Sequence, residues 1–279
     1  MNSKVKSILH HKSLPDRKLL AAPYMFWSAF FIIIPLCMIL YYGITDKTGA
    51  FTLKNIMAIA SVGHARAFVR ALLLSVISTV ICFLLAYPLA MILSDMKGNK
   101  HNFIILIFIL PMWMNFLLRT LAWQTLLEKT GVINGILAFF NLPPLRIINT
   151  SYAIILGMVY NFLPFMVLPL YNALSKIDEN VVNAAHDLGA NKIQTFFRII
   201  LPLSVPGIIS GITMVFVPAL TTFVISTLLG GSKVLLIGNV IEQEFTQASN
   251  WHLGSGLSIV LMIFIIINMI ISALLDKEE

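Results

Sequence analysis

Residues 183–202 read NAAHDLGANKIQTFFRIILP, a polar stretch between two long uncharged segments, residues 147–175 and 199–232. Each uncharged segment is long enough to cross a bilayer, because about 20 apolar residues span the hydrocarbon core as a helix. We therefore expect the polar stretch to be a loop that is held at the membrane surface at both ends.

The residues within and just before this loop predict two short helices joined by a tight turn. Asp178 and Glu179 suit the first turn of a helix, where carboxylates face the positive end of the helix dipole. Gly189 is expected to end that helix, since glycine enters the left-handed conformation without steric cost. Asn191 can cap a second, interfacial helix. Its apolar residues recur at helical spacing and are Ile193, Phe196, Phe197 and Ile200.

The loop resembles that of type I ABC importer permeases, written EAA, three residues, Gly, nine residues and I-x-L-P. The matching residues are Asn183-Ala184-Ala185, Gly189 and residues 199–202, with Asn183 where the family usually has Glu. In that family the loop docks into a groove on a cytoplasmic ATPase and carries its motion to the transmembrane helices. The alternative is an ordinary amphipathic connector. The resemblance implies that the following residues contact the ATPase: Asn183, Ala184, Ala185, Asp187 and Gly189.

The composition places the chain among polytopic membrane proteins. Of its 279 residues, 58% are hydrophobic and only 11% are charged, whereas a soluble domain carries roughly 25% charged residues. The net charge of +7 comes from residues scattered through loops, which argues against nucleic acid as a partner. Both cysteines, Cys37 and Cys82, fall in predicted spans, so we expect no disulfide framework.

Hydrophobic runs predict six transmembrane helices, at residues 19–45, 71–94, 103–127, 152–174, 199–229 and 257–275. Lys and Arg are denser in the inner segments if both termini and the 183–202 loop are cytoplasmic, as the positive-inside rule requires. Short surface or re-entrant elements are expected at residues 132–144 and 230–245. The predicted fold is an all-α, six-span transmembrane bundle, and the resemblance implies the type I ABC importer permease fold.

The expected organisation has four parts. A cytoplasmic basic tail covers residues 1–18, and the first transmembrane helix with its outer loop covers 19–65. The permease domain covers 66–275 and contains the coupling loop 175–202, and a tail covers 276–279.

The sequence offers no candidate catalytic or metal site. The six histidines show no metal-ligand spacing, and a phosphate-binding glycine loop is missing, so we expect no cofactor and no ATP hydrolysis in this chain. No Asp or Glu falls in the central part of a predicted span, which argues against a proton-relay transporter or an intramembrane protease. We therefore predict that the chain is not an enzyme.

A second informative stretch is PMWMNFLLR, residues 111–119. Trp113 and Asn115 are expected to lie deeper in the bilayer than Arg119, which would extend its charge to the interface. Trp123 is expected to be an interfacial belt residue. An asparagine at depth needs a partner, either another helix or a polar passenger.

Four stretches, residues 111–119, 161–171, 184–208 and 228–245, resemble the PotB-type permeases of spermidine/putrescine ABC importers. The resemblance implies a polyamine substrate and location in the bacterial inner membrane. It also implies three partners: a second homologous permease (PotC-like), an ATPase dimer that binds the ATP (PotA-like), and an extracytoplasmic polyamine-binding protein (PotD-like). A polycation can be held by aromatic faces and carbonyl dipoles. The candidate path residues are Trp113, Asn115, Tyr160 and Asn161.

Three alternatives remain open from the residues, and one of them, a structural membrane subunit without a translocation path, would leave the loop motif unexplained. A sulfate, molybdate or iron permease would share the loop motif. A membrane-embedded acyl or prenyl transferase would need a His, Asp or metal cluster at a membrane face, and the sequence shows none.

Overall fold

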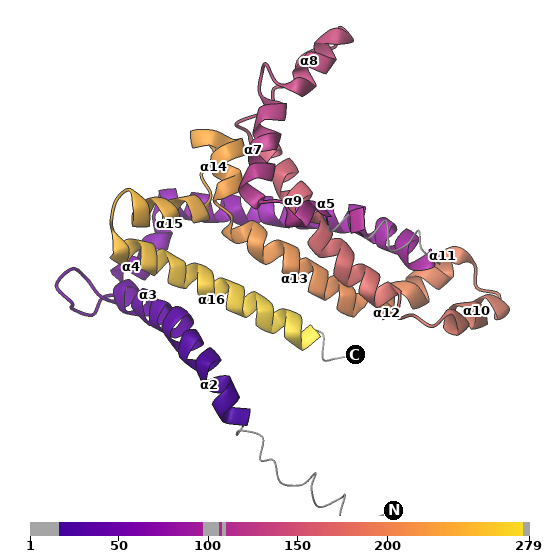
Figure 1. The fold of residues 1–279 in the computed structure, drawn as a ribbon, viewed down its shortest axis with the longest axis horizontal. Helices are drawn as coiled ribbons and strands as arrows, with labels where there is room; N and C mark the ends of the chain where they lie inside the picture. The colour runs from indigo at the N-terminus through magenta and orange to yellow at the C-terminus, as the bar shows by residue number, and fades with distance from the viewer. Residues whose placement is uncertain (1–16, 97–105, 108–109, 276–279) are drawn as a thin grey trace, which may run out of the picture.

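The computed structural model describes residues 17–96, 106–107 and 110–275, and most of them are helical (Figure 1). The first three helical segments form one continuous rod. The named elements are α2 (Arg17–Ser28), η1 (Ala29–Ile33), α3 (Ile34–Ile44), α4 (Lys54–Met57), η2 (Ala58–Ala60), α5 (Val62–Asp95), α7 (Phe116–Leu127), α8 (Val132–Phe139), α9 (Ser151–Leu174), α10 (Glu179–Asp187), α11 (Lys192–Thr195), η3 (Phe196–Ile200), α12 (Leu201–Leu203), α13 (Val205–Thr221), α14 (Val224–Gly230), η4 (Gly231–Lys233), α15 (Ile237–Thr246) and α16 (Trp251–Leu275).

Four of the described helices are long and apolar enough to cross a membrane: Pro23–Ile44, α5, α9 and residues 251–274 of α16. A fifth span results if Lys192–Leu203 and α13, which meet at 63°, are counted together. The third predicted span, residues 103–127, lies partly outside the described residues. Its described part is interrupted before α7, because Asn115 is the N-cap of that helix. The total of six spans stays a prediction.

The expectation of one unbroken helix over residues 199–229 is wrong. The chain bends at Ser204, between α12 and α13, and α13 ends at Thr221, after which Thr222 is extended. Pro206 lies in the first turn of α13, where the missing N–H group costs no helical hydrogen bond. Helices also begin earlier than predicted: α5 begins at Val62 and α16 at Trp251, so the boundary expected at residues 65/66 falls inside α5.

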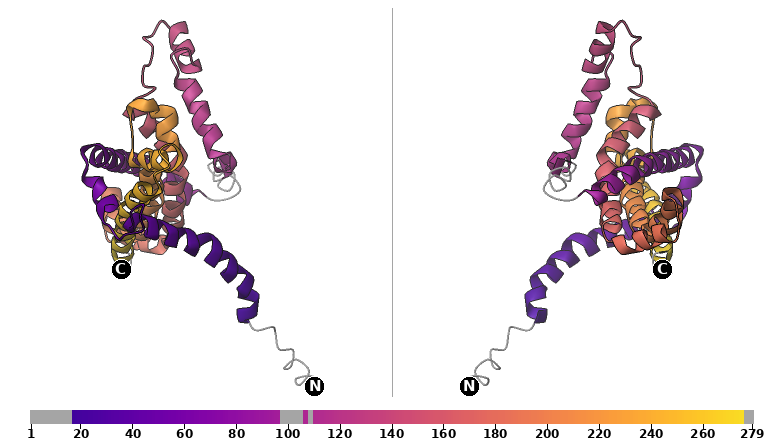
Figure 2. Two further views of the ribbon diagram at one scale, coloured as in Figure 1. Left: turned by 90° about the vertical axis from the view of Figure 1, so that its left-hand side faces the viewer. Right: turned by 90° about the vertical axis from the view of Figure 1, so that its right-hand side faces the viewer.

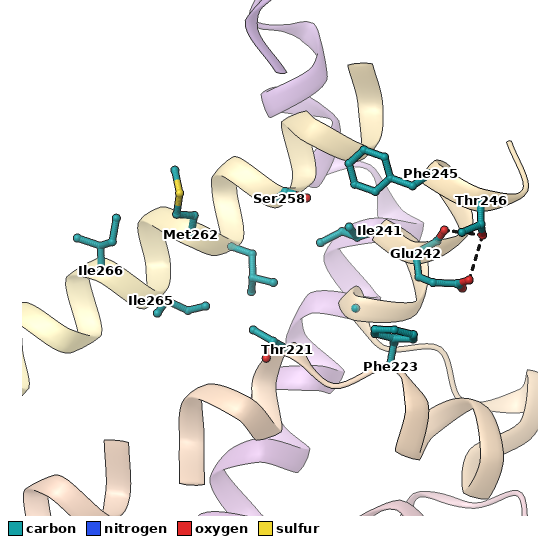
Figure 3. A pocket seen from close by; sticks show the side chains of 12 residues that line it. Thr221, Phe223, Ile241, Glu242, Phe245, Thr246, Ser258, Met262, Ile265 and Ile266 are labelled. Carbon is teal, nitrogen blue, oxygen red and sulfur yellow. Dashed lines mark hydrogen bonds between the residues drawn. The ribbon is translucent and has the colours of Figure 1, made fainter. Parts of the chain in front are cut away.

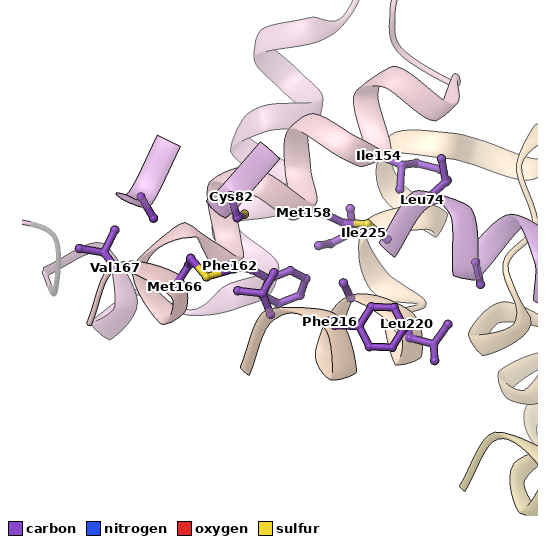
Figure 4. Packing of buried hydrophobic residues seen from close by; sticks show 14 of the residues in the cluster. Leu74, Cys82, Ile154, Met158, Phe162, Met166, Val167, Phe216, Leu220 and Ile225 are labelled. Carbon is purple, nitrogen blue, oxygen red and sulfur yellow. The ribbon is translucent and has the colours of Figure 1, made fainter. Parts of the chain in front are cut away.

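The core lies where α5, α9 and α13 pack against one another. Figure 4 shows Leu74 and Cys82 of α5 facing Met158 of α9, with Phe216 of α13 completing the cluster. Gly207 permits the close approach of α13 to α9, because a Cβ atom there would lie 2.8 Å from the carbonyl oxygen of Pro169. Small residues at such contacts let the backbones of two membrane helices approach closely.

The segment α10–α12 lies toward one end of the molecule, and α4 and α15 lie toward the other (Figure 1). Helix α16 runs from the end near α15 toward the end that holds α10–α12. The two rods α2–α3 and α7–α8 project from the packed helices in opposite directions (Figure 2). The loop motif and the end of α16 therefore lie toward the same side of the molecule (Figure 1). That this side is cytoplasmic stays a prediction.

Candidate functional site

The loop motif forms a compact projection, residues 178–200, which we call the coupling knob. It begins at Asp178, whose side chain accepts a hydrogen bond from the backbone N–H of Asn180 at 2.9 Å. Such a cap stabilises a helix by about 1 kcal/mol. Glu179 occupies the first turn of α10. The predicted start of the first helix is confirmed.

A Schellman turn at Gly189 ends α10. The N–H of Ala190 donates to the carbonyl oxygen of Ala185 at 3.0 Å, and the N–H of Gly189 donates to that of His186 at 2.9 Å. Gly189 has φ of +85°, in the left-handed region that favours glycine. The Nδ1 atom of His186 lies 3.0 Å from the carbonyl oxygen of Ala190 and adds a further bond across the turn. The predicted turn is confirmed.

Asn191 begins the second helix of the knob with a capping box. Its side chain accepts from the N–H of Gln194 at 2.8 Å, and the Gln194 side chain accepts from the N–H of Asn191 at 3.0 Å. The helix then contains a π turn over Phe196–Ile200. The four apolar residues do not share one buried face: Phe196 and Ile200 pack against the core, and Ile193 and Phe197 are exposed.

The residues expected to meet the ATPase are not all accessible. Asn183, Ala184, Asp187 and Gly189 are exposed. Ala185 is only 7% exposed, and it lines a cavity of about 410 Å³ together with Leu188 and Gly189. The sequence reasoning missed Leu188, which is 89% exposed at the tip of the turn.

Asn183 lines a cavity of about 570 Å³ between the knob and the end of α5. Asp95 and Lys192 line the same cavity. The position at which the family usually carries Glu therefore shares a cavity with residues of both charges within this chain.

Tyr87 connects the knob to the body of the protein. Its hydroxyl lies 2.9 Å from the Oγ atom of Ser204 at the bend before α13. Its ring meets that of Phe196 edge to face, with the centroids 5.7 Å apart. Both Tyr87 and Ser204 are buried. Through Tyr87, the knob is thus in contact with α5 and with the bend in the broken span.

The four path candidates lie in different surroundings. Trp113 is 77% exposed and precedes the helix break. Asn115 caps α7, its Oδ1 atom accepting from the N–H groups of Leu117 and Leu118 at 2.8 and 3.3 Å. The expectation that Asn115 needs a distant partner for this oxygen is corrected, because the partner is its own helix.

Tyr160 and Asn161 lie on α9 near α7. Tyr160 meets Trp123 edge to face at 5.2 Å, a packing contact for Trp123 that the sequence did not indicate. Asn161 is buried and its Nδ2 atom donates to the carbonyl oxygen of Gly157 at 2.9 Å. Its Oδ1 atom has no partner within the described part of the chain.

Arg119 does not extend to the surface of the chain as expected. Its side chain is only 6% exposed, and its Nε and Nη1 atoms have no hydrogen-bond partner among the described residues. The surroundings of α7 therefore contain a buried positive charge. The described residues contain no group of three or more His, Cys, Asp or Glu side chains placed to hold a metal ion.

The chain matches the family described as binding-protein-dependent transport system inner membrane component over residues 17–277. It is 39% identical to the spermidine/putrescine transport system permease protein PotB of Haemophilus influenzae over 251 residues, 87% of this chain and 88% of the relative. It is 36% identical to the protein of that name in Escherichia coli over 264 residues, 90% of this chain and 96% of the relative.

The fold is also that of a solved bacterial alginate ABC transporter chain, in complex with an alginate pentasaccharide-bound periplasmic protein. The TM-score is 0.78 at 17% sequence identity, and the match covers 94% of this chain and 93% of the other. This likeness shows the architecture.

Proposed function

We propose that this chain, which belongs to the family of binding-protein-dependent transport system inner membrane components, forms half of the translocation path of an ATP-driven importer for spermidine and putrescine. The chain is a multi-pass inner membrane protein. The names of its relatives support polyamines over sulfate, molybdate or iron as the substrate. The proposed transport mechanism rests mainly on the structure of the knob, which has a rigid turn and an exposed Leu188.

ATP hydrolysis is proposed to take place on a separate ATPase dimer (PotA-like). The second half of the path would come from a homologous permease (PotC-like), and polyamine would arrive on an extracytoplasmic binding protein (PotD-like). An exposed leucine beside a tight turn supports docking into an apolar groove, since burial of a Leu side chain stabilises a contact by roughly 1.5–3 kcal/mol.

Transmission would begin when ATP-dependent movement of the ATPase displaces the knob. The knob is internally rigid, because both of its helices are capped and the turn between them is fixed by backbone hydrogen bonds. Its displacement moves Phe196, which contacts Tyr87, and shifts the bend at Ser204. The 63° bend gives the span an element whose angle can differ between two states.

For the path we propose Trp113, Asn115, Tyr160 and Asn161. Trp113 has an exposed ring able to hold a polycation through its face. Asn161 offers an Oδ1 atom that no described residue occupies. Asn115 keeps only its amide group for a passenger, because its oxygen caps α7.

Competition for uptake tests the substrate. Cells that lack their own polyamine importers would receive this chain with its proposed partners, and uptake of labelled spermidine would be measured against excess putrescine, sulfate, molybdate or ferric iron. We expect competition by putrescine alone. Uptake of sulfate, with spermidine uptake at the level of empty cells, would refute the proposal.

A further inference from the structure

The end of the broken span borders a cavity of about 520 Å³ that none of the assigned residues lines. It lies between α13, α15 and α16, at the opposite end of α13 from the knob. Figure 3 shows the apolar side chains of Met262, Ile265 and Ile266 lying across from Phe223 and Glu242. The walls are mostly apolar.

The break in the span places the end of α13 at the edge of this cavity. α13 stops at Thr221, and Gly238 approaches the stop so closely that a Cβ atom there would lie 2.8 Å from the carbonyl oxygen of Thr221. Both residues line the cavity. The carboxyl end of a helix carries a partial negative charge, and interrupted transmembrane helices use such ends to hold cations.

Glu242 is the one acidic residue among those described that line the cavity, and none of them is Lys or Arg. The Oε1 atom of Glu242 accepts a hydrogen bond from the hydroxyl of Thr246 at 3.0 Å, which leaves the other carboxylate oxygen available. The aromatic rings of Phe223 and Phe245 line the cavity as well. A carboxylate, a helix end and aromatic rings all favour a cation.

A buried asparagine sets the geometry of these groups. Asn239 donates to the carbonyl oxygen of Phe223 at 3.1 Å and to the hydroxyl of Thr227 at 2.8 Å. Its Oδ1 atom accepts from the N–H of Leu236 at 3.1 Å. Because Glu242 follows Asn239 by three residues on α15, this network ties Glu242 to the backbone of Phe223.

We infer that this cavity is a binding subsite for an alkyl polyamine, with one ammonium group held by Glu242 and the end of α13, and with the methylene chain against α16. The inference rests on the proposed polyamine transport and adds residues to it. The apolar wall matches the methylene chain, and the negative groups match its charge.

The test is the KM for spermidine uptake by proteoliposomes that contain the complete complex. We expect Glu242→Gln to raise KM about tenfold, because a charge-assisted contact is replaced by a neutral one, and to leave the maximal rate largely unchanged. Glu244→Gln is the matched control, since Glu244 lies two residues further on α15 and does not line the cavity. Its KM should equal that of the wild type.

Phe223→Leu and Phe245→Leu should each raise KM roughly threefold, because bulk is kept and the aromatic face is lost. Glu242→Asp, which keeps the charge, should raise KM less than Glu242→Gln. If the complex does not assemble with Glu242→Gln, the KM values of these variants decide whether the cavity binds spermidine.

Unchanged KM in the Glu242 and Phe variants, with spermidine transported by the wild type, overturns the subsite and leaves the proposed function intact. If the cavity instead holds a lipid chain or a helix of the second permease, the variants would keep the wild-type KM and would give a lower yield of assembled complex. A wild type that does not transport spermidine contradicts the proposed function itself.

Discussion

The hydroxyl group of Tyr87 on α5 lies 2.9 Å from the Oγ atom of Ser204, at the bend between α12 and α13. The Tyr87 ring also meets Phe196 of the coupling knob edge to face. One buried side chain thus touches the knob, the bend and the longest helix of the core. In the proposed mechanism, movement of the ATPase would reach the broken span through this residue.

Tyr87→Phe should impair coupling while keeping the fold. The ring contact with Phe196 survives, and the lost hydrogen bond contributes about 1 kcal/mol. We expect normal levels of assembled complex and spermidine uptake lowered about three- to tenfold. The measurement is spermidine uptake in cells, normalised to the amount of this protein in the membrane. Tyr152→Phe, at an exposed tyrosine of α9, is the control and should transport normally. Equal uptake by the two variants would show that the Tyr87 hydroxyl has no part in coupling.

Gly189→Val should abolish transport with membrane insertion intact. No atom blocks a Cβ at this position, so the effect comes from the backbone alone, whose φ of +85° is strained for a β-branched residue. Gly189→Asn is the control, because Asn tolerates the left-handed region, and it should keep most of the uptake. Similar uptake by the two variants would show that the turn does not set the angle between the helices of the knob.

Leu188→Asp should release the ATPase. Leu188 is almost fully exposed, so a charge there leaves this chain stable and disrupts an apolar contact in the complex. The measurement is the amount of ATPase that copurifies with this chain in detergent, which we expect to fall about tenfold. Leu142→Asp makes the same change at an exposed leucine after α8 and should retain the ATPase. Retention by both variants would place docking elsewhere.

Trp113→Ala should weaken polyamine uptake about tenfold, since a desolvated cation–π contact contributes on the order of 2 kcal/mol. Trp113→Phe keeps a weaker aromatic face and should lose less. Trp27, an exposed tryptophan on α2, is the matched control, and Trp27→Ala should transport normally. If Trp113→Leu transports as well as Trp113→Phe, the ring has no role in holding the substrate.

The sequence predicted the knob well because its structure depends on local interactions. Asp178, Gly189 and Asn191 act within five residues of their partners, so spacing alone identifies the caps and the turn. The apolar runs likewise predicted α5 and α9, whose membrane-spanning length follows from composition.

The breaks in the span 199–229 were not predictable, because distant residues stabilise them. Tyr87 forms a hydrogen bond with Ser204, and the side chain of Asn239 donates to the carbonyl oxygen of Phe223, which lies sixteen residues earlier in the chain. The exposure of Leu188 and the burial of Arg119 depend equally on tertiary structure. The hydropathy of a residue describes its own polarity and gives no information about the neighbours that bury it.

Accumulation of labelled spermidine in proteoliposomes tests the central claim most directly, namely that this chain is a path for polyamines opened by ATP hydrolysis on a partner. The liposomes would hold the complete complex, with binding protein on the outer side and ATP supplied to the ATPase side. We predict accumulation that requires ATP and this chain, and that sulfate does not inhibit. Spermidine that crosses equally well without ATP, or a complex that hydrolyses ATP and accumulates sulfate in place of spermidine, would contradict the account.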